Sequence, residues 1–385
     1  MCKLRVLVVG PYPQEEGKTK GGVQAVTYYL TEGLAIRGDM DVHVITLVSG
    51  LNSEIKRVSK NGVHVHLIPN CECFGCLTGF AVVSARIRKV MHEINPDIVH
   101  VHTQTAYPHA VLERGYPSVL TPHGVFYKEA ALVEGFVNTI QSRLACGYER
   151  KALKRARHII LLNNYLAKCF DGLLDDANIN WIDNPIDDKF FDVPDKSEPG
   201  AILFLGVFLE RKGVLHLARA ASILKTRNVG FKIWIVGPVG DQAFFTKVKN
   251  YVHENGLDNY IEFLGLVSEE EVMERYARCS MLVLPSFEET APMVISQAQA
   301  AGKPVVASAV GGIPEMIKDD VTGYTVPYGD AEGLADRIGR LLADPEKRKK
   351  MGEAARIVAE QRYRRASVVE KTLKVYEEVL ADAKR

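Results

Sequence analysis

The chain has 385 residues, of which 47% are hydrophobic and 25% are charged, and its formal net charge is +1. This length is too great for one ordinary hydrophobic core and favours two domains. The near-zero charge argues against a dedicated nucleic-acid binder, and no stretch approaches the roughly 20 apolar residues of a membrane span. The first apolar run is too short for a signal peptide, so we expect a cytoplasmic protein whose seven cysteines are reduced.

The amino-terminal half alternates short apolar runs with helical patterns. Residues 5–9 form the first expected strand, and Gly21 and Gly22 precede a segment in which apolar residues recur at spacings of three and four. Paired glycines before a helix let the backbone approach a ligand closely, with helical N–H groups pointing outward. A flexible turn is the simpler interpretation of this pair taken alone.

A histidine follows one of the expected strands directly. Residues 118–121 form that strand, and Pro122, His123 and Gly124 come next. Open α/β sheets bind ligands at the carboxyl edge of their strands, so His123 is a candidate for the chemistry of the site. The alternative is a structural histidine that is hydrogen-bonded within the fold.

Three cysteines, Cys71, Cys73 and Cys76, lie in the unusually apolar segment 70–84. Their spacing departs from the CxxC pairs that structural zinc prefers, and the only nearby candidates for a fourth ligand are two histidines in the preceding strand. We therefore expect no metal here. Basic residues follow at positions 86–89, so contact with a lipid-linked acceptor or a membrane surface is one interpretation of the segment. A helix packed on its domain is the simpler one.

The second half begins after a linker. Residues 188–200 contain two prolines and several charges, and the alternation of strands and helices then restarts. The expected strands are residues 201–205, 231–236, 261–263, 281–284 and 305–307, and everything after residue 331 is helical in pattern. The dinucleotide fingerprint G-x-G-x-x-G appears in neither half, which weakens a dehydrogenase interpretation.

The most informative stretch is the unit at residues 281–307, a strand, an acidic turn, a helix and a second strand. Pro292 suits the first turn of this helix, which we expect to end at Ala301. N–H groups at the start of a helix have no partner within it and suit a phosphate. The N–H groups in question belong to Thr290, Ala291, Met293 and Val294.

The same turn carries acceptors for hydroxyl groups. A carboxylate at Glu289 would repel a phosphate, so we expect it to face hydroxyls instead. Gln297 lies four residues after Met293, on the same helical face, and its side chain leans back toward the turn. An anion site beside hydroxyl acceptors suits a sugar joined to a diphosphate. The alternative is a helix cap with solvated acids.

Two cations open the first helix of the second half. Arg211 and Lys212 precede Gly213, and the helix is expected at residues 214–225. Adjacent cations followed by helical N–H groups can bind a diphosphate and stabilise it as a leaving group. Surface cations before a helix are also common, so these two carry little weight without the rest.

Seven segments, in order along nearly the whole chain, share one resemblance. They are GGV at 21–23, TPHG at 121–124, NPID at 184–187, GVFLERKG at 206–213, PSFEETAPM at 285–293, AGKPVV at 301–306 and GGIPE at 311–315. As a set they are similar to the retaining GT-B glycosyltransferases of family four, the group 1 glycosyltransferases. The resemblance implies an α/β fold of two Rossmann-like, doubly wound domains facing across a cleft. We accordingly expect an acceptor-side domain at 1–190, a nucleotide-sugar domain at 200–365 and a final helix at 366–385 that packs back on the first domain.

The resemblance also assigns roles to individual residues. Glu289 would contact hydroxyls of the donor sugar, and Lys212, assisted by Arg211, would bind its diphosphate. His123 would lie near the donor sugar, beside its 6-hydroxyl. Contacts to the donor, mostly through the main chain, are implied for Gly21, Gly22, Thr290, Ala291, Met293, Val294, Leu264 and Val267.

The chain departs from the family pattern at two positions. The second acid of the E-x7-E motif is Gln297, which as an amide can still donate and accept hydrogen bonds to a ribose. The arginine of the phosphate loop falls on Val207, and Arg211 is the candidate to replace it. Loss of one of two phosphate-neutralising charges would weaken stabilisation of the leaving group.

The implied reaction transfers a sugar from a nucleotide diphosphate, UDP or GDP, to a hydroxyl acceptor with retention, and requires no metal ion or other cofactor. The expected partners are thus a nucleotide sugar and a glycan, glycolipid or small-molecule acceptor, without nucleic acid. A lipid-linked acceptor would bring peripheral contact with the inner face of a membrane. The alternatives left open are a GT-B epimerase or phosphorylase and a non-catalytic subunit that binds sugar nucleotides.

Overall fold

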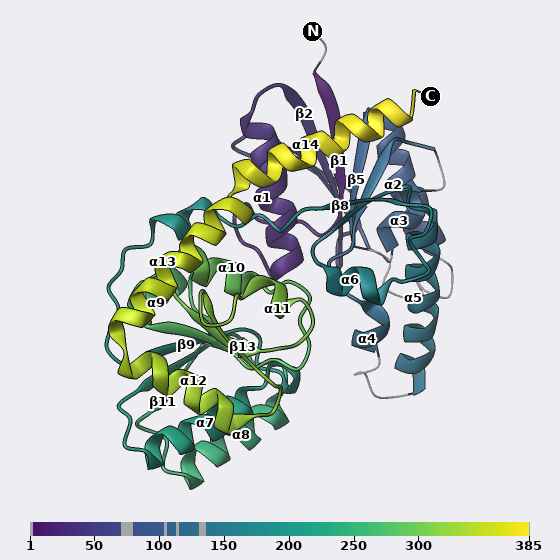
Figure 1. Cartoon of the computed structure of the whole chain (residues 1–385). Coiled ribbons are helices and arrows are strands. Elements are labelled where there is room, and N and C mark those ends of the chain that lie inside the picture. The colour runs from purple at the N-terminus through teal and green to yellow at the C-terminus, as the bar shows by residue number, and fades with distance from the viewer. Residues whose placement is uncertain (1–2, 71–79, 104–105, 113–114, 131–135, 385) are drawn as a thin grey trace. The chain divides into compact units, whose positions relative to one another are not determined.

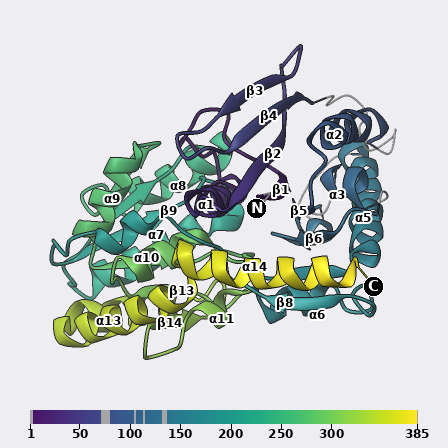
Figure 2. The same ribbon diagram turned by 90° about the horizontal axis from the view of Figure 1, so that it is seen from above.

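The computed structural model describes residues 3–70, 80–103, 106–112, 115–130 and 136–384. The chain divides into two compact units, each built around one sheet (Figures 1 and 2). The first unit comprises Met1–Pro185 and Arg365–Arg385, and the second comprises Ile186–Arg364. The chain thus leaves the first unit once and returns to it with its last helix.

The first unit contains an eight-stranded sheet in the order β3-β4-β2-β1-β5-β6-β7-β8. Its strands are β1 (Leu4–Val9), β2 (Met40–Val48), β3 (Ile55–Val58), β4 (His64–Pro69), β5 (Ile98–His102), β6 (Ser118–Thr121), β7 (His158–Leu161) and β8 (Asn178–Trp181). All neighbouring pairs are parallel except β3 with β4. The strand order reverses between β1 and β5, which defines the topological switch point of this sheet.

Helices cover both faces of this sheet (Figure 2). They are α1 (Gly22–Ile36), α2 (Ala81–Ile94), α3 (Ala106–Val111), α4 (Phe126–Ala130), α5 (Phe136–Arg155), α6 (Asn164–Cys169) and α14 (Arg365–Asp382). The last helix, drawn in yellow in Figure 1, packs on α1, β5 and β6. Its Val368 and Val369 share one buried cluster with Val6 and Val42 of the sheet. The C-terminal helix therefore completes the core of the first unit.

The second unit contains a six-stranded, wholly parallel sheet in the order β11-β10-β9-β12-β13-β14. Its strands are β9 (Ala201–Leu205), β10 (Lys232–Val236), β11 (Ile261–Gly265), β12 (Met281–Leu284), β13 (Val305–Ser308) and β14 (Gly323–Val326). This is the strand order of a Rossmann domain, and it reverses between β9 and β12. Short apolar strands such as β12, buried along their whole length, are typical of a parallel sheet with both faces covered.

The helices of the second unit begin mostly at polar caps. They are α7 (Val214–Thr226), α8 (Gln242–Glu254), α9 (Glu269–Arg278), α10 (Met293–Ala300), α11 (Ile313–Met316), α12 (Ala331–Ala343) and α13 (Pro345–Arg362), with 3-10 turns at Asp188–Asp192 and Glu210–Lys212. Asp241, Ser268, Asp330 and Asp344 each accept a hydrogen bond from a backbone N–H in the first turn of the helix that follows. In the described ranges, no helix combines the length and apolar character needed to cross a bilayer.

Candidate functional site

The loops that follow β9 and β12 meet at the carboxyl edge of the second sheet. These two strands are neighbours, with Leu203 opposite Leu282, and the strand order reverses between them. Ligands of open α/β sheets bind in the crevice at such a reversal, because the loops on either side of it diverge. The fold therefore brings residues 206–213 and 285–292 together at the position where a ligand is expected.

Lys212 and Glu289 form an ion pair between these two loops. The Nζ atom of Lys212 lies 2.5 Å from Oε1 of Glu289, and the hydroxyl of Ser286 donates a hydrogen bond to the same oxygen at 2.9 Å. The side chains are only 15% and 9% exposed, respectively. Salt screens such a sheltered pair much less than a surface pair. Both charges stand at the edge of the sheet, where a ligand that carries both anionic and hydroxyl groups could engage them.

Close backbone contacts hold the two loops together. Gly213 has φ +71°, and a Cβ atom there would lie 1.9 Å from the carbonyl oxygen of Pro285, so only glycine fits. The N–H of Phe287 donates to the carbonyl of Arg211 at 2.7 Å. The relative positions of the Lys212 and Glu289 side chains are thus fixed by main chain on both sides of the pair.

A third loop, after β13, contacts the backbone of Glu289. The N–H of Gly312 donates to the carbonyl of Glu289 at 3.0 Å. Gly311 has φ +54°, and a Cβ atom there would lie 1.8 Å from that same carbonyl oxygen. Gly311 of the GGIPE segment is therefore required for the close approach of two backbones, and together with the N–H of Gly312 it positions the backbone of Glu289.

The helix after this turn starts later than the sequence indicates. Pro292 is the N-cap residue of α10, with φ −67° and ψ 117°, and the helix begins at Met293. The expectation that Pro292 lies in the first helical turn is wrong, because its ψ is extended rather than helical. Thr290 and Ala291 consequently lie in the loop, whereas Met293 and Val294 are in the first turn. Among the described residues, the N–H groups of Ala291, Met293 and Val294 have no hydrogen-bond partner.

Gln297 lies on α10 and is held by a buried tyrosine. The hydroxyl of Tyr276, at the end of α9, lies 3.2 Å from Oε1 of Gln297 and 3.1 Å from the carbonyl oxygen of Val294. Burial raises the pKa of Tyr276 far above its usual value, so the hydroxyl stays protonated and can donate a hydrogen bond. The carbonyl end of the amide is occupied, and its NH2 group is the end left for a ligand.

Val207 lies where the family pattern has an arginine, and Arg211 is the candidate to replace that arginine; both residues are exposed to solvent. Val207 is 40% exposed. Arg211 is also exposed, and its guanidinium makes no ion pair with any residue in the described ranges. The backbone of Arg211 is fixed by Phe287 while its side chain extends from the 3-10 turn at Glu210–Lys212. The structure leaves this cation next to Lys212 and available to an anion.

Leu264 and Val267 bracket the end of β11, at the same edge of the sheet as β9 and β12. Both are half-buried against the core of the second unit, and Gly265 between them has φ +67°. Leu266 is 79% exposed. This bend presents main chain and one apolar side chain at the carboxyl edge.

In the first unit, Gly21 and Gly22 are exposed at the start of α1. Gly21 is the N-cap, with φ 119° and ψ 166°, a conformation open to glycine alone, and α1 begins at Gly22. Their position follows the loop after β1, one of the two strands at the switch point of the first sheet. At that edge, Gly21 thus forms an exposed turn of backbone that requires glycine, and Gly22 begins α1.

His123 also belongs to the first unit, in the loop after β6, and it is paired with a second histidine. Its Nε2 atom lies 2.8 Å from Nδ1 of His102, the last residue of β5. Burial lowers the pKa of His123 to about 4 and holds that of His102 well below its usual value, so both rings are neutral at pH 7. Because a parallel pairing register places His102 opposite Thr121, the loop after β6 brings His123 back over the end of β5.

Three partners of the candidate residues were not predicted from the sequence: Ser286, Tyr276 and His102. Ser286 contacts Glu289, three positions away in the chain. Tyr276 contacts Gln297 and His102 contacts His123, each 21 positions away. Ser286 is the exception that the sequence could have revealed, since it is three residues before Glu289 within one turn. The other two contacts depend on the order of strands.

The cysteines 71, 73 and 76 lie outside the described residues. Within the described ranges, no group of three or more histidine, cysteine or acidic side chains is arranged to hold a metal ion.

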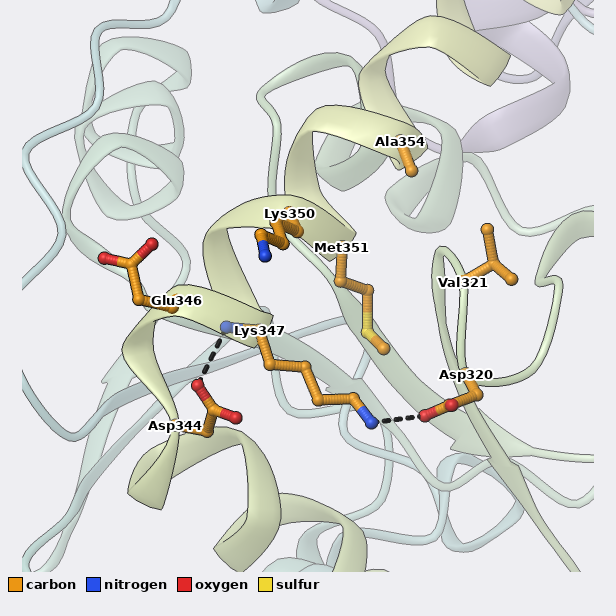
Figure 3. Close-up of a pocket in the computed structure, with 8 residues that line it drawn as sticks. All are labelled: Asp320, Val321, Asp344, Glu346, Lys347, Lys350, Met351 and Ala354. Carbon is orange, nitrogen blue, oxygen red and sulfur yellow. Dashed lines mark hydrogen bonds and ion pairs between the residues drawn. The ribbon is translucent and has the colours of Figure 1, made fainter.

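A pocket of about 440 Å³ lies elsewhere in the second unit, between the turn before β14 and the start of α13 (Figure 3). None of the candidate residues lines it. Its Lys347 and Asp320 already form an ion pair, with Nζ 2.6 Å from Oδ1. Asp320 precedes β14, so the pocket is at the amino edge of the sheet, opposite to the edge where ligands bind in this fold.

Two family models match consecutive parts of the chain. The model described as Glycosyltransferase Family 4 matches residues 20–190, and the model described as Glycosyl transferases group 1 matches residues 185–358. The boundary between them coincides with the passage from the first unit to the second at Pro185 and Ile186.

Several curated proteins are similar over most of their length. An uncharacterized glycosyltransferase of Methanocaldococcus jannaschii is 28% identical over 89% of this chain and 91% of its own. N-acetyl-alpha-D-glucosaminyl L-malate synthase of Bacillus anthracis is 27% identical over 94% of this chain and 96% of its own. D-inositol 3-phosphate glycosyltransferase of Saccharomonospora viridis is 26% identical over 98% and 94%, respectively.

Solved structures show the same fold. Sucrose-phosphate synthase of Thermosynechococcus elongatus superposes with a TM-score of 0.82 at 18% identity, covering 99% of this chain and 100% of its own. HepE of Anabaena in complex with UDP-glucose superposes with a TM-score of 0.74 at 17% identity, covering 97% and 100%. These neighbours define the class: two Rossmann-like domains in the GT-B fold. The chain belongs to the group 1 glycosyltransferases and is an enzyme that transfers sugar from nucleotide-sugar donors.

Proposed function

We propose that the protein transfers a hexose from a UDP- or GDP-sugar to a hydroxyl acceptor with retention of configuration and without a metal ion. The observation that carries this proposal is the Lys212–Glu289 ion pair at the switch point of the second sheet. A cation for the diphosphate and a carboxylate for the sugar hydroxyls stand there side by side. The bare N–H groups at the start of α10 supply further phosphate donors.

The proposed reaction is a front-face substitution. The acceptor oxygen forms a bond to the anomeric carbon on the side from which the bond to the β-phosphate oxygen breaks. The departing phosphate takes the proton of the acceptor hydroxyl, so no enzyme nucleophile is required. Lys212 and Arg211 stabilise the negative charge that develops on the phosphate, and each such donor contributes about 3 kcal/mol.

The named relatives support the substrate class. HepE of Anabaena was crystallised with UDP-glucose, and starch synthase IV of Arabidopsis thaliana with ADP. N-acetyl-alpha-D-glucosaminyl L-malate synthase and D-inositol 3-phosphate glycosyltransferase are each named for a small compound that carries hydroxyl groups, L-malate and D-inositol 3-phosphate. We take a nucleoside diphosphate sugar as the donor, and we place the nucleotide base along Leu264 and Val267.

The proposal assigns acceptor binding to the first unit, together with two contacts to the donor. In these contacts, Gly21 and Gly22 would approach the phosphates, and His123 would contact the donor sugar. A lipid-linked acceptor, met at the cytoplasmic face of a membrane, is the finer proposal; it rests on α2, which exposes Val82 and Lys89 to solvent. Cosedimentation with vesicles containing anionic lipid would test that part separately, and its loss in Lys89→Glu would support it.

A thermal-shift screen against UDP-, GDP- and ADP-sugars tests the donor assignment, since a ligand that binds only the folded state raises the melting temperature. We expect stabilisation by at least one UDP- or GDP-sugar, and its loss in Lys212→Ala with the fold intact. Lys232→Ala is the matched control, because Lys232 pairs with Glu262 at the amino end of β10. Stabilisation that survives in Lys212→Ala would refute the assignment.

A further inference from the structure

The switch point of the first sheet carries a buried histidine that the proposed reaction does not use. His102 ends β5, next to β1, where the strand order reverses, and its side chain is 1% exposed. A Cβ atom at Gly10, after β1, would lie 2.8 Å from Cβ of His102. Glycine at position 10 therefore allows the ends of β1 and β5 to approach closely, at the edge where open sheets bind ligands.

The hydrogen bond between His102 and His123 joins two neutral rings. Nδ1 of His102 lies 2.8 Å from Nε2 of His123, and the ring planes are 9° apart. Burial keeps the pKa of each ring below neutrality, so each ring has one N–H and one bare nitrogen. One ring must donate and the other must accept. The direction of this bond sets the tautomer of both.

The second nitrogen of His102 decides the direction. Its Nε2 atom is buried and has no hydrogen-bond partner among the described residues. A buried N–H without a partner is rarer than a buried acceptor without one, because the unmet donor loses its bond to water entirely. The proton of His102 therefore lies on Nδ1 and is donated to Nε2 of His123. The neutral ring of His123 then carries its own proton on Nδ1.

A second layer prevents His102 from turning. The ring of His100 stacks on His102 with 4.2 Å between centroids. His100 is fixed at both nitrogens, with Nδ1 2.8 Å from the hydroxyl of Tyr376 and Nε2 2.7 Å from Oγ1 of Thr121. Tyr376 comes from α14, so the C-terminal helix supports the stack. The stacked ring of His100, held at both nitrogens, opposes a flip of the His102 ring that would break its bond to His123.

We propose that His102 is a positioning residue that fixes His123 as the Nδ1–H tautomer, so that His123 donates a hydrogen bond to an oxygen of the donor sugar. Apart from the bond to His102, His123 makes no hydrogen bond with any residue in the described part of the chain, and its side chain is half-buried at the carboxyl edge. Its free Nδ1–H is available to a ligand. This inference rests on the proposed function only for the identity of that oxygen.

The tautomer is tested first, in the free protein. The probe is the imidazole nitrogen spectrum of the 15N-histidine-labelled full chain, with His123 assigned by its loss in His123→Gln. We expect a protonated Nδ1 and a bare Nε2 on His123. A proton on Nε2 in the wild-type protein overturns the proposal, whatever the enzyme binds.

Two variants of equal size then separate positioning from packing. His102→Asn keeps a donor near the place of Nδ1, whereas His102→Asp can only accept at pH 8.5 and demands a proton on Nε2 of His123. We expect the Nδ1–H tautomer in the Asn variant and its reversal in the Asp variant. The KM for the nucleotide sugar found in the thermal-shift screen should rise about tenfold in the Asp variant, the effect of one lost hydrogen bond, and about threefold or less in the Asn variant.

Free UDP or GDP serves as the internal control, because it lacks the sugar. Its Kd should be the same in both variants and the wild type. Equal rises of KM in both variants, without a change of tautomer, would show that His102 acts only through packing and would overturn the proposal. Absence of any nucleotide-sugar binding by the wild-type protein would instead refute the proposed function and leave the tautomer result standing.

Discussion

Lys212 and Glu289 neutralise each other, with 2.5 Å between Nζ and Oε1. Close backbone contacts of Gly213 with Pro285 and of Gly311 with Glu289 hold their loops in place. A phosphate that binds Lys212 must therefore compete with a carboxylate already in place. In the proposed complex, the sugar hydroxyls donate to that carboxylate and compensate for the loss of the ion pair. The pair thus favours a ligand that has both parts over a free diphosphate.

Glu289→Gln should separate diphosphate binding from sugar transfer. The amide can still accept from Ser286, but it no longer neutralises Lys212 or repels a phosphate. We expect the affinity for free UDP or GDP to rise about threefold, and the rate of transfer to fall about 10²-fold. Isothermal titration and a coupled assay for released nucleotide measure the two effects. Glu262→Gln, which breaks the exposed pair with Lys232, is the control and should change neither; weaker diphosphate binding in Glu289→Gln would contradict the idea of competition.

Gly311→Ala should distort Glu289 through the backbone alone. The new Cβ atom would meet the carbonyl oxygen of Glu289 at 1.8 Å, at a φ of +54° that alanine disfavours. We expect a loss of at least about 3 kcal/mol in the free energy of unfolding together with loss of activity. Gly302→Ala is matched in φ, at +68°, but its nearest neighbour is 3.9 Å away, so it should cost only about 1 kcal/mol and keep activity. Urea denaturation compares them, and equal costs would show that the close contact is unimportant.

Gln297→Glu should strengthen recognition of a ribose. A carboxylate at 297 can accept the hydrogen bond from Tyr276 with one oxygen and offer the other to a ribose hydroxyl. We expect UDP or GDP to bind about tenfold more tightly, and the matching 2′-deoxy nucleotide to gain less. Titration calorimetry of UDP and dUDP gives both numbers. An equal gain for the two nucleotides would place the sugar of the nucleotide elsewhere.

The buried histidines should make the first unit sensitive to acid. Burial lowers the pKa of His100 to about 3 and that of His123 to about 4, below the usual value near 6.5 of an unfolded chain. Below pH 6.5 the unfolded state therefore binds protons that the folded state does not, and the free energy of unfolding falls as the pH falls. At pH 5 each such histidine costs about 2 kcal/mol relative to pH 7.5.

Urea denaturation at both pH values measures this effect, and His100→Gln isolates one group. The variant should lose about 2 kcal/mol less than the wild type between pH 7.5 and pH 5, whatever its stability at neutral pH. An identical pH dependence in the two proteins would mean that His100 is protonated in the folded state.

The elements of the second unit were predictable because their signals are local. β12 is a short apolar run that ends at a proline, and α10 is followed by glycine and proline. The exposed edge strand β3 was not predicted, because two of its four residues, Lys56 and Arg57, are cations and no apolar alternation marks it. The start of α10 was also misplaced, because Pro292 has an extended ψ of 117° and is the N-cap residue rather than part of the first turn.

The residues of the candidate site were predictable one at a time, and their pairing was not. Lys212 and Glu289 were expected to bind different parts of a donor, and their contact follows only from the reversal of strand order between β9 and β12. The contact of His102 with His123 likewise needs the neighbouring strands β5 and β6. Sequence motifs name the candidate residues, while the order of strands determines which of them touch each other.

A crystal structure of the protein with the UDP- or GDP-sugar selected by thermal shift tests the central proposal most directly. We predict the diphosphate within hydrogen-bond distance of Lys212 Nζ and of the N–H groups at the start of α10, with Glu289 on the sugar hydroxyls. A donor bound anywhere else, such as the pocket beside Lys347 and Asp320, would contradict it.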